Sequence, residues 1–126
     1  MKITIHNMQD YTAEQVFRAC LEPLLGLSKA AFNESRKNSS YVLGCPAGQL
    51  LSKAEARTFD KEGKNWGYLV NHGLVPDYCC HVIRAAQEIH DHPRVDRPVQ
   101  EAKDYCEKQG WSTDWLEQFD EDMFLK

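Results

Sequence analysis

The sequence lacks a long apolar run. No stretch of its 126 residues approaches the roughly 18 to 20 consecutive apolar residues that a transmembrane helix needs. The first ten residues, MKITIHNMQD, also carry polar groups where a secretory signal would have its apolar stretch. We therefore expect a cytoplasmic protein that makes no membrane contact.

The cysteines do not suit a disulfide framework. Their number, five, is odd, and Cys79 and Cys80 are neighbours that cannot easily bridge to each other. We interpret all five as reduced thiols, as expected in a cytosol. A chain of this length with 42% hydrophobic and 27% charged residues predicts a single globular domain over residues 1–126.

Motifs that bind nucleotides or carry a serine nucleophile are also missing. The chain has no GxxxxGK[ST] loop, no GxGxxG after a strand and no GxSxG turn. We therefore predict no cofactor and name no catalytic residue.

Positive charge is scarce in the second half of the chain. The net charge is −4, and residues 64–126 hold seven Lys and Arg against twelve Asp and Glu. A face that neutralises nucleic-acid phosphates shows the opposite balance. The charge distribution therefore predicts no direct contact with nucleic acid, and it favours a partner protein with a basic surface.

The hydrophobic spacing predicts a mainly helical α+β fold. Residues 2–6 (KITIH) alternate in polarity and residues 40–43 (SYVL) are rich in β-formers, so we expect them to pair in a small two- or three-stranded antiparallel sheet. About five helices should pack on this sheet. Four of them are expected at residues 53–59, 66–71, 78–91 and 97–110, and the first begins after Thr12 and ends at Glu22 or at Gly26.

Several helix starts have recognisable capping residues. Thr12 with Gln15, and Ser52 with Glu55, have the spacing of a capping box, in which two side chains bond each other's backbone amides. Asp77 is expected to cap the helix at 78–91 in the simpler way.

Turn residues delimit the remaining elements. Asp96 is expected to cap a helix that has Pro98 in its first turn and ends at Gly110. A short helix should follow Ser112, and residues 33–40 (NESRKNSS) should form a polar loop.

A group of cysteines and histidines is the strongest suggestion of a metal site. Zinc takes four nitrogen or sulfur ligands, usually in closely spaced pairs that converge. His81 and His90 are nine residues apart, so on one helix they differ by about 900° and point to opposite sides. The spacing therefore does not predict a metal site among Cys79, Cys80, His81, His90 and His92.

The dipeptide His90–Asp91 has two interpretations. Metal-dependent phosphohydrolases of the HD class use the same pair, together with a further upstream His and a distant downstream Asp. A histidine near a helix C-terminus can instead bond the last carbonyl groups and is favoured there by the helix dipole. We favour the second interpretation and keep a small metal-dependent hydrolase using His90, Asp91 and His92 as the alternative function.

The stretch GCPAGQLLSKAEAR, at residues 44–57, contains a cysteine in a tight turn. Cys45 would act as a nucleophile if a base lay at hydrogen-bond distance, but no base or oxyanion partner is identifiable. Pro46 and Gly48 indicate a sharp turn, where cysteine commonly serves as a small buried residue. We interpret Cys45 as a corner residue without a catalytic role.

The acidic C-terminal helix and tail, at about 111–126, contain the predicted contact surface. Tryptophan is enriched among the residues that dominate binding energies, and two tryptophans here stand among carboxylates. The predicted partner-binding residues are Trp111, Asp114, Trp115, Glu117, Asp120, Glu121 and Asp122.

Four segments follow one another between about residues 11 and 95: YTAEQVF, YVLGCPAGQLL, EGKNWGYLVNHGLVP and VIRAAQEIHD. They contain a capped first helix, a Cys-x-x-Gly turn at Cys45 and Gly48, a Gly-Leu-Pro-like turn at 73–76, and a helix ending Gln-x-x-His-Asp at 87–91. This order resembles a family of small uncharacterised proteins from bacteria and their phages. The strand region before Cys45 is shorter than in that pattern, and residues 96–126 have no counterpart in it. The resemblance implies a phage or prophage setting.

These observations lead to one functional hypothesis. In the absence of an assembled catalytic site, the acidic second half and its aromatic residues predict a non-enzymatic protein-binding module. In a phage setting, such a module would be an accessory protein that inhibits or redirects a host protein in the host cytoplasm, for example a nucleic-acid-processing or defence factor.

Overall fold

Six α-helices dominate the computed structural model, which describes residues 2–37, 40–42, 44–92, 95–121 and 124–125. The α-helices are α1 (Ala13–Leu25), α2 (Lys29–Lys37), α3 (Lys53–Lys61), α4 (Trp66–Asn71), α5 (Cys80–Asp91) and α6 (Pro98–Gln109). Short 3₁₀ helices lie before, between and after them at η1 (Met8–Asp10), η2 (Ala47–Leu50) and η3 (Asp114–Gln118).

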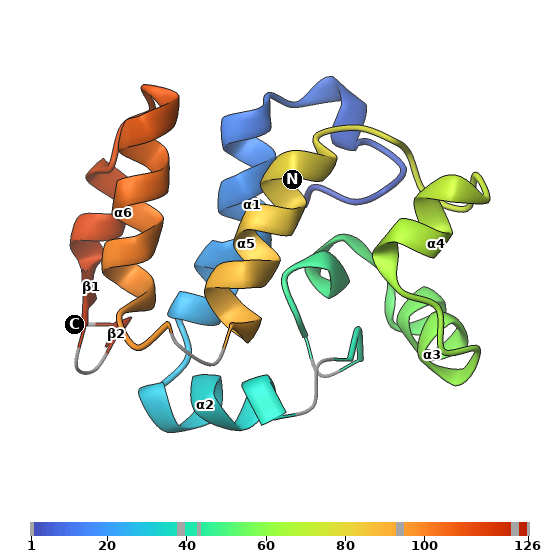
Figure 1. Ribbon diagram of the computed structural model, residues 1–126, viewed down its shortest axis with the longest axis horizontal. Helices are drawn as coiled ribbons and strands as arrows, with labels where there is room; N and C mark the ends of the chain where they lie inside the picture. The colour runs from blue at the N-terminus through green and yellow to red at the C-terminus, as the bar shows by residue number, and fades with distance from the viewer. Residues whose placement is uncertain (1, 38–39, 43, 93–94, 122–123, 126) are drawn as a thin grey trace.

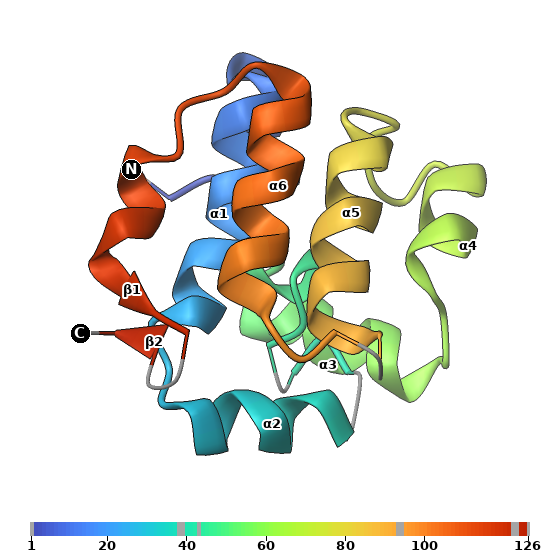
Figure 2. The same cartoon turned by 60° about the vertical axis from the view of Figure 1, so that its left-hand side comes forward.

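Helices α1, α5 and α6 form the centre of the molecule. Helix α5 packs along α1, and α6 runs back beside both of them (Figures 1 and 2). Helix α2 crosses below the ends of this bundle, whereas α3 and α4 lie beyond α5. The core is built from apolar side chains that these helices turn toward one another, including Phe17, Leu21, Leu25, Val82, Ile83, Ala86, Ala102 and Cys106.

Helix α1 begins and ends at residues with clear roles. The predicted capping box is confirmed, because Thr12 Oγ1 accepts the Gln15 amide and Gln15 Oε1 accepts the Thr12 amide. Pro23 does not end the helix, which continues to Leu25 and has Gly26 as its C-cap. Burial of the last turn against the core offsets the one backbone hydrogen bond that Pro23 cannot donate.

The predicted sheet is wrong, and its first segment shows why. The Thr4 amide donates to Asn7 Oδ1 at 2.7 Å, and the Met8 amide donates to Thr4 O at 2.9 Å, so residues 2–6 lead into a turn. Short polar side chains compete in this way for amides that a sheet would use. Ile5 is still buried, which explains the alternating pattern without a strand.

The second predicted strand is also a turn. Asp60 of α3 accepts the amides of Tyr41 and Val42, each at 2.9 Å, while Leu43 lies outside the described residues. The extended pairing that the structure does describe joins β1 (Phe119–Asp120) to β2 (Phe124–Leu125), far from both predicted segments. The fold is therefore mainly helical, and the predicted α+β class with helices on a two- or three-stranded sheet is incorrect.

Helix α2 replaces most of the polar loop expected at residues 33–40. Ser28 begins it, because Ser28 Oγ accepts the Ala31 amide at 3.1 Å. Phe32 is fully buried and attaches the helix to the core. The burial of this aromatic side chain thus helps to stabilise a helix in a segment whose composition otherwise resembles that of a loop.

Helix α5 starts later than predicted. Its N-cap is Cys79, which adopts the left-handed conformation (φ 55°) and makes no side-chain capping bond. Asp77 therefore does not cap the helix. Its Oδ1 instead accepts the Cys80 thiol at 3.1 Å.

Helix α6 receives its cap from a distant part of the chain. Its N-cap residue is Arg97 and not the predicted Asp96. The carboxylate of Glu121 accepts the amides of Val99 and Gln100, at 3.2 and 2.9 Å. The predicted end is confirmed, because Gly110 is the C-cap and has a left-handed φ of 77°.

We expect Gly48→Ala to lower the free energy of unfolding by about 1–3 kcal/mol. A Cβ at this position would lie only 2.6 Å from the Tyr41 carbonyl oxygen, so the backbone around residues 41 and 48 would have to move apart. The measurement is urea unfolding followed by circular dichroism.

Gly67→Ala is the matched control for this substitution. Gly67 lies within α4, and the nearest atom to its added Cβ, Asn65 Oδ1, would be at an ordinary 3.5 Å. Because alanine favours a helix over glycine, this variant should be unchanged or up to about 1 kcal/mol more stable. Equal destabilisation of both variants would contradict the assignment of close packing to Gly48.

Candidate functional site

The predicted contact tryptophans make most of their contacts within the protein. The Trp111 ring lies 6.0 Å from Phe17 and 5.9 Å from Tyr105. The Trp115 ring lies 5.4 Å from the Arg18 guanidinium. Both tryptophans are half-buried, so each offers only part of its ring to a partner.

The predicted contact carboxylates are divided among different environments. Asp114 and Glu117 are exposed, and Glu117 lies 3.5 Å from Lys103 Nζ. Asp120 is half-buried, and Glu121 caps α6. Asp122 lies outside the described residues, so the full predicted set stays a prediction.

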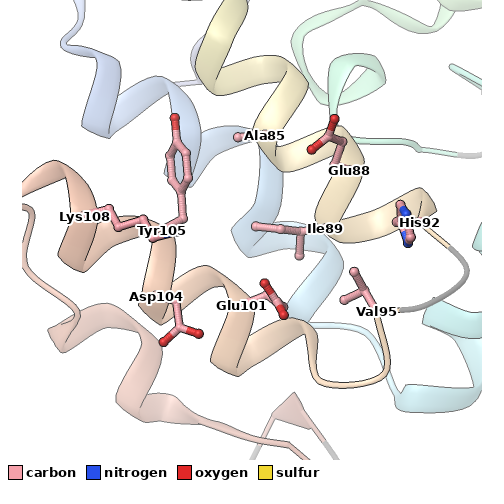
Figure 3. A pocket seen from close by; sticks show the side chains of 9 residues that line it. All are labelled: Ala85, Glu88, Ile89, His92, Val95, Glu101, Asp104, Tyr105 and Lys108. Carbon is pink, nitrogen blue, oxygen red and sulfur yellow. The ribbon is translucent and has the colours of Figure 1, made fainter.

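A groove between α5 and α6 gathers acidic groups on a more continuous surface. It encloses about 430 Å³. Ile89 is buried at its centre, and three exposed carboxylates, those of Glu88, Glu101 and Asp104, surround it (Figure 3). The full lining is Ala85, Glu88, Ile89, His92, Val95, Glu101, Asp104, Tyr105 and Lys108. We call this feature the acidic groove.

The helical period explains why these residues lie together. On α5 and its C-cap residue the lining positions are 85, 88, 89 and 92, and on α6 they are 101, 104, 105 and 108. Each helix thus contributes positions i, i+3, i+4 and i+7, which share one face. This repeated spacing is the sequence signal that could have located the groove, had the pairing of α5 with α6 been known.

The acidic groove combines two kinds of recognition. Ala85, Ile89, Val95 and Tyr105 provide apolar or aromatic area, while the carboxylates stand at its edges. Apolar side chains of a ligand would be buried on this floor, and long basic side chains would extend over it toward the edges. The carboxylates would attract such a ligand from solution.

His90 is buried and fully hydrogen-bonded. It is 0% exposed, Nε2 lies 2.8 Å from Ser35 Oγ, and Nδ1 lies 2.5 Å from Asp91 Oδ1. No ring nitrogen is therefore left to bind a metal. His81 is exposed, which confirms that the two histidines point to opposite sides of α5.

The hydrogen bonds around His90 connect three elements. Ser35 Oγ donates to Phe32 O at 2.7 Å, so it accepts from His90 Nε2. The Asp91 carboxylate accepts from His90 Nδ1 and from Gln87 Nε2. Gln87 Oε1 accepts the Ala47 amide at 3.1 Å, which extends the network from α2 and α5 to η2.

The alternative metal site is not assembled around these residues. Within the ranges that the structure describes, no three His, Cys, Asp or Glu side chains are placed to hold a metal ion together. His92 is exposed, while His90 is enclosed between α2 and α5. The geometry gives His90 and Asp91 a role in joining helices.

Cys45 has the surroundings of a buried structural residue. It is 3% exposed. Burial raises the pKa of its thiol to about 11, although hydrogen bonds from the Gly48 backbone and the Gln87 side chain act in the opposite direction. The thiol stays protonated near neutral pH, where only a thiolate would be an effective nucleophile. The interpretation of Cys45 as a buried corner residue is confirmed.

Comparisons with known protein families, with curated proteins and with solved structures found no match to this chain. Among the residues described, no helix combines the length and apolar character required to cross a membrane. The resemblance to small bacterial and phage proteins stays a prediction.

Proposed function

We propose that this protein is a non-enzymatic binding module whose acidic groove holds a basic segment of a partner protein. The observation that carries the proposal is the placement of three carboxylates around one apolar floor, between two packed helices. Acidic residues alone would indicate only an ordinary solvated surface and no binding site. The apolar floor between them supplies the area that a stable contact needs.

An amphipathic helix with Lys or Arg along its edges suits this shape. Helix α5 has 12 residues and is about 18 Å long, so the groove beside it can take about three turns of a third helix. Apolar residues at i, i+3, i+4 and i+7 of that helix would pack on Ile89 and Tyr105. Its basic side chains would pair with Glu88 on α5 and with Glu101 and Asp104 on α6.

The remaining exposed acids support the same choice of partner. Asp114 and Glu117, from the predicted contact set, add negative charge after α6. A negative field of this kind speeds association with a basic partner and makes the rate sensitive to salt. If the phage setting holds, the partner is a host protein with a basic surface, which the module inhibits or redirects.

The test uses a synthetic helix of about 14 residues made of Leu and Lys in helical period, since shorter helices are marginal in water. Fluorescence anisotropy should show saturable binding that weakens as salt rises. The double variant Glu88→Lys/Glu101→Lys should bind at least about tenfold more weakly, as expected when attractive pairs become repulsive.

Two controls distinguish the groove from general charge attraction. Glu107→Lys makes a charge reversal on α6 outside the groove lining, and it should weaken binding much less than the double variant. A peptide of the same composition with Leu and Lys shuffled out of helical period should bind poorly. Equal effects of all charge reversals, or equal binding of both peptides, would contradict the proposal.

A further inference from the structure

A second cavity gathers positive charge in this acidic protein. It encloses about 450 Å³ and is bordered by Lys2, by Tyr41 and Val42, by lining residues between Gly44 and Ser52, and by the first half of α3. Lys2, Lys53 and Arg57 all line it, and none of its lining residues is an Asp or a Glu. Because the chain as a whole carries a net charge of −4, this concentration of cations is local.

The three cations approach the cavity from two separate parts of the chain. Lys53 and Arg57 are four residues apart on α3 and therefore share one face, while Lys2 comes from the segment before η1. Across the part of the chain that the structure describes, none of the three side chains forms an ion pair. Their charges are available to a ligand.

The nearest acidic groups on α3 bond to other partners. Glu55 accepts the Ser52 amide at 2.8 Å and lies 2.8 Å from His6 Nε2. Asp60 accepts the amides of Tyr41 and Val42. These bonds to backbone amides hold both carboxylates away from the cavity, and neither residue lines it. At the start of α3, the Glu55 amide already donates to the Ser52 hydroxyl and is not open to an anion. An anion in the cavity would therefore be bound chiefly by side chains.

The other walls suit an organic group. Tyr41 is half-buried, Leu51 is buried, and Val42 is 54% exposed, an unusual position for a large apolar side chain in this protein. The volume lies within the range of about 300–1,000 Å³ typical of small-molecule sites. A free phosphate would leave much of it unfilled.

We propose that this cavity binds a phosphate monoester, with Lys2, Lys53 and Arg57 on the phosphate and Val42 against the organic group. Guanidinium and ammonium groups form short, charge-assisted bonds to phosphate oxygens, and Arg can donate two in parallel. The site is separate from the acidic groove, whose lining residues it does not share. It therefore gives the module a ligand site independent of its proposed protein partner.

The test is an NMR titration of the full chain with adenosine 5′-monophosphate, inorganic phosphate or adenosine, each added alone. The monophosphate should give saturable shifts at the amides of Val42, Gly44 and Gly48, and it should bind more tightly than either of the other two probes. Lys53→Gln/Arg57→Gln should weaken this binding by at least about tenfold, as expected when charge-assisted bonds to the phosphate are lost.

Lys61→Gln removes a charge from the same helix outside the cavity lining and should leave the affinity unchanged. The far-ultraviolet spectra of the variants should match that of the original protein, because all three replaced side chains are exposed. Absence of saturable shifts with the monophosphate would overturn the proposal. Equal affinity for inorganic phosphate, or an equal effect of Lys61→Gln, would also overturn it.

Discussion

Replacement of His90 by alanine is expected to lower the free energy of unfolding by about 3–5 kcal/mol. The ring is fully buried against Phe32, with centroids 5.1 Å apart, so its removal leaves a cavity. It also deprives Ser35 and Asp91 of a hydrogen-bond partner in the contact between α2 and α5. Urea unfolding at pH 7, monitored by tryptophan fluorescence and circular dichroism, measures the loss.

Two further variants make this expectation specific. His81→Ala removes an exposed imidazole from the same helix and should change stability by less than about 0.5 kcal/mol. Ser35→Ala leaves the His90 Nε2–H buried without its partner and should cost about 1–3 kcal/mol. A loss below about 1 kcal/mol for His90→Ala would show that the network does not join the helices.

A steep loss of stability above pH 9 is the second large effect that we expect. Burial raises the pKa of the Cys45 and Cys106 thiols from 9.0 to about 11, and it raises that of Cys20 further still. Below pH 9 these thiols are protonated in both states, so the folded state keeps its full stability. Between pH 9 and 11 the unfolded chain releases protons that the folded chain retains, and unfolding becomes easier.

The size of this effect follows from the number of buried thiols. Each one contributes about 1.4 kcal/mol per pH unit inside the window, so the three remove about 4 kcal/mol per unit. The half-buried Cys80, whose thiol pKa burial also raises to about 11, acts in the same direction. Urea unfolding under reducing conditions at pH 7, 9 and 10 tests this. Cys106→Ala should lower the slope by about one quarter to one third, and an unchanged stability from pH 7 to 10 would contradict the expectation.

The sequence predicts elements best where their signals are local. The capping boxes at Thr12 and Ser52 and the C-terminal glycine at Gly110 lie where expected, because each signal and its effect are only a few residues apart. The apolar stripe of α5 likewise predicts its buried face, which includes Val82, Ile83, Ala86 and Ile89.

The structural predictions are wrong where the carboxylate of a residue distant in the sequence accepts the backbone amides. Tyr41 and Val42 have strand-forming side chains, yet Asp60, which is 18 and more residues away, accepts their amides. Glu121 caps α6 from 22 residues beyond Val99. No local sequence pattern predicts hydrogen bonds between residues so far apart in the chain. By contrast, Ser28 and Phe32 were local signals for α2 that the polar composition of the segment concealed.

The sequence predicts the acidic character of the candidate site but not its position. The excess of acid in the second half of the chain is visible in the sequence, and Glu88, Glu101 and Asp104 belong to it. Their convergence depends on the antiparallel packing of α5 and α6, which the sequence alone does not specify (Figure 2). The predicted tryptophans, by contrast, were needed to cover α1 and α6.

The cap on α6 has a consequence for the order in which the protein forms during synthesis. The amides of Val99 and Gln100 leave the ribosome well before Glu121, so the first turn of α6 has no carboxylate to bond while the chain is still growing. Uncapped helix ends fray in water. The N-terminal turn of α6, which carries Glu101 of the acidic groove, therefore gains its cap only after residue 121 has emerged.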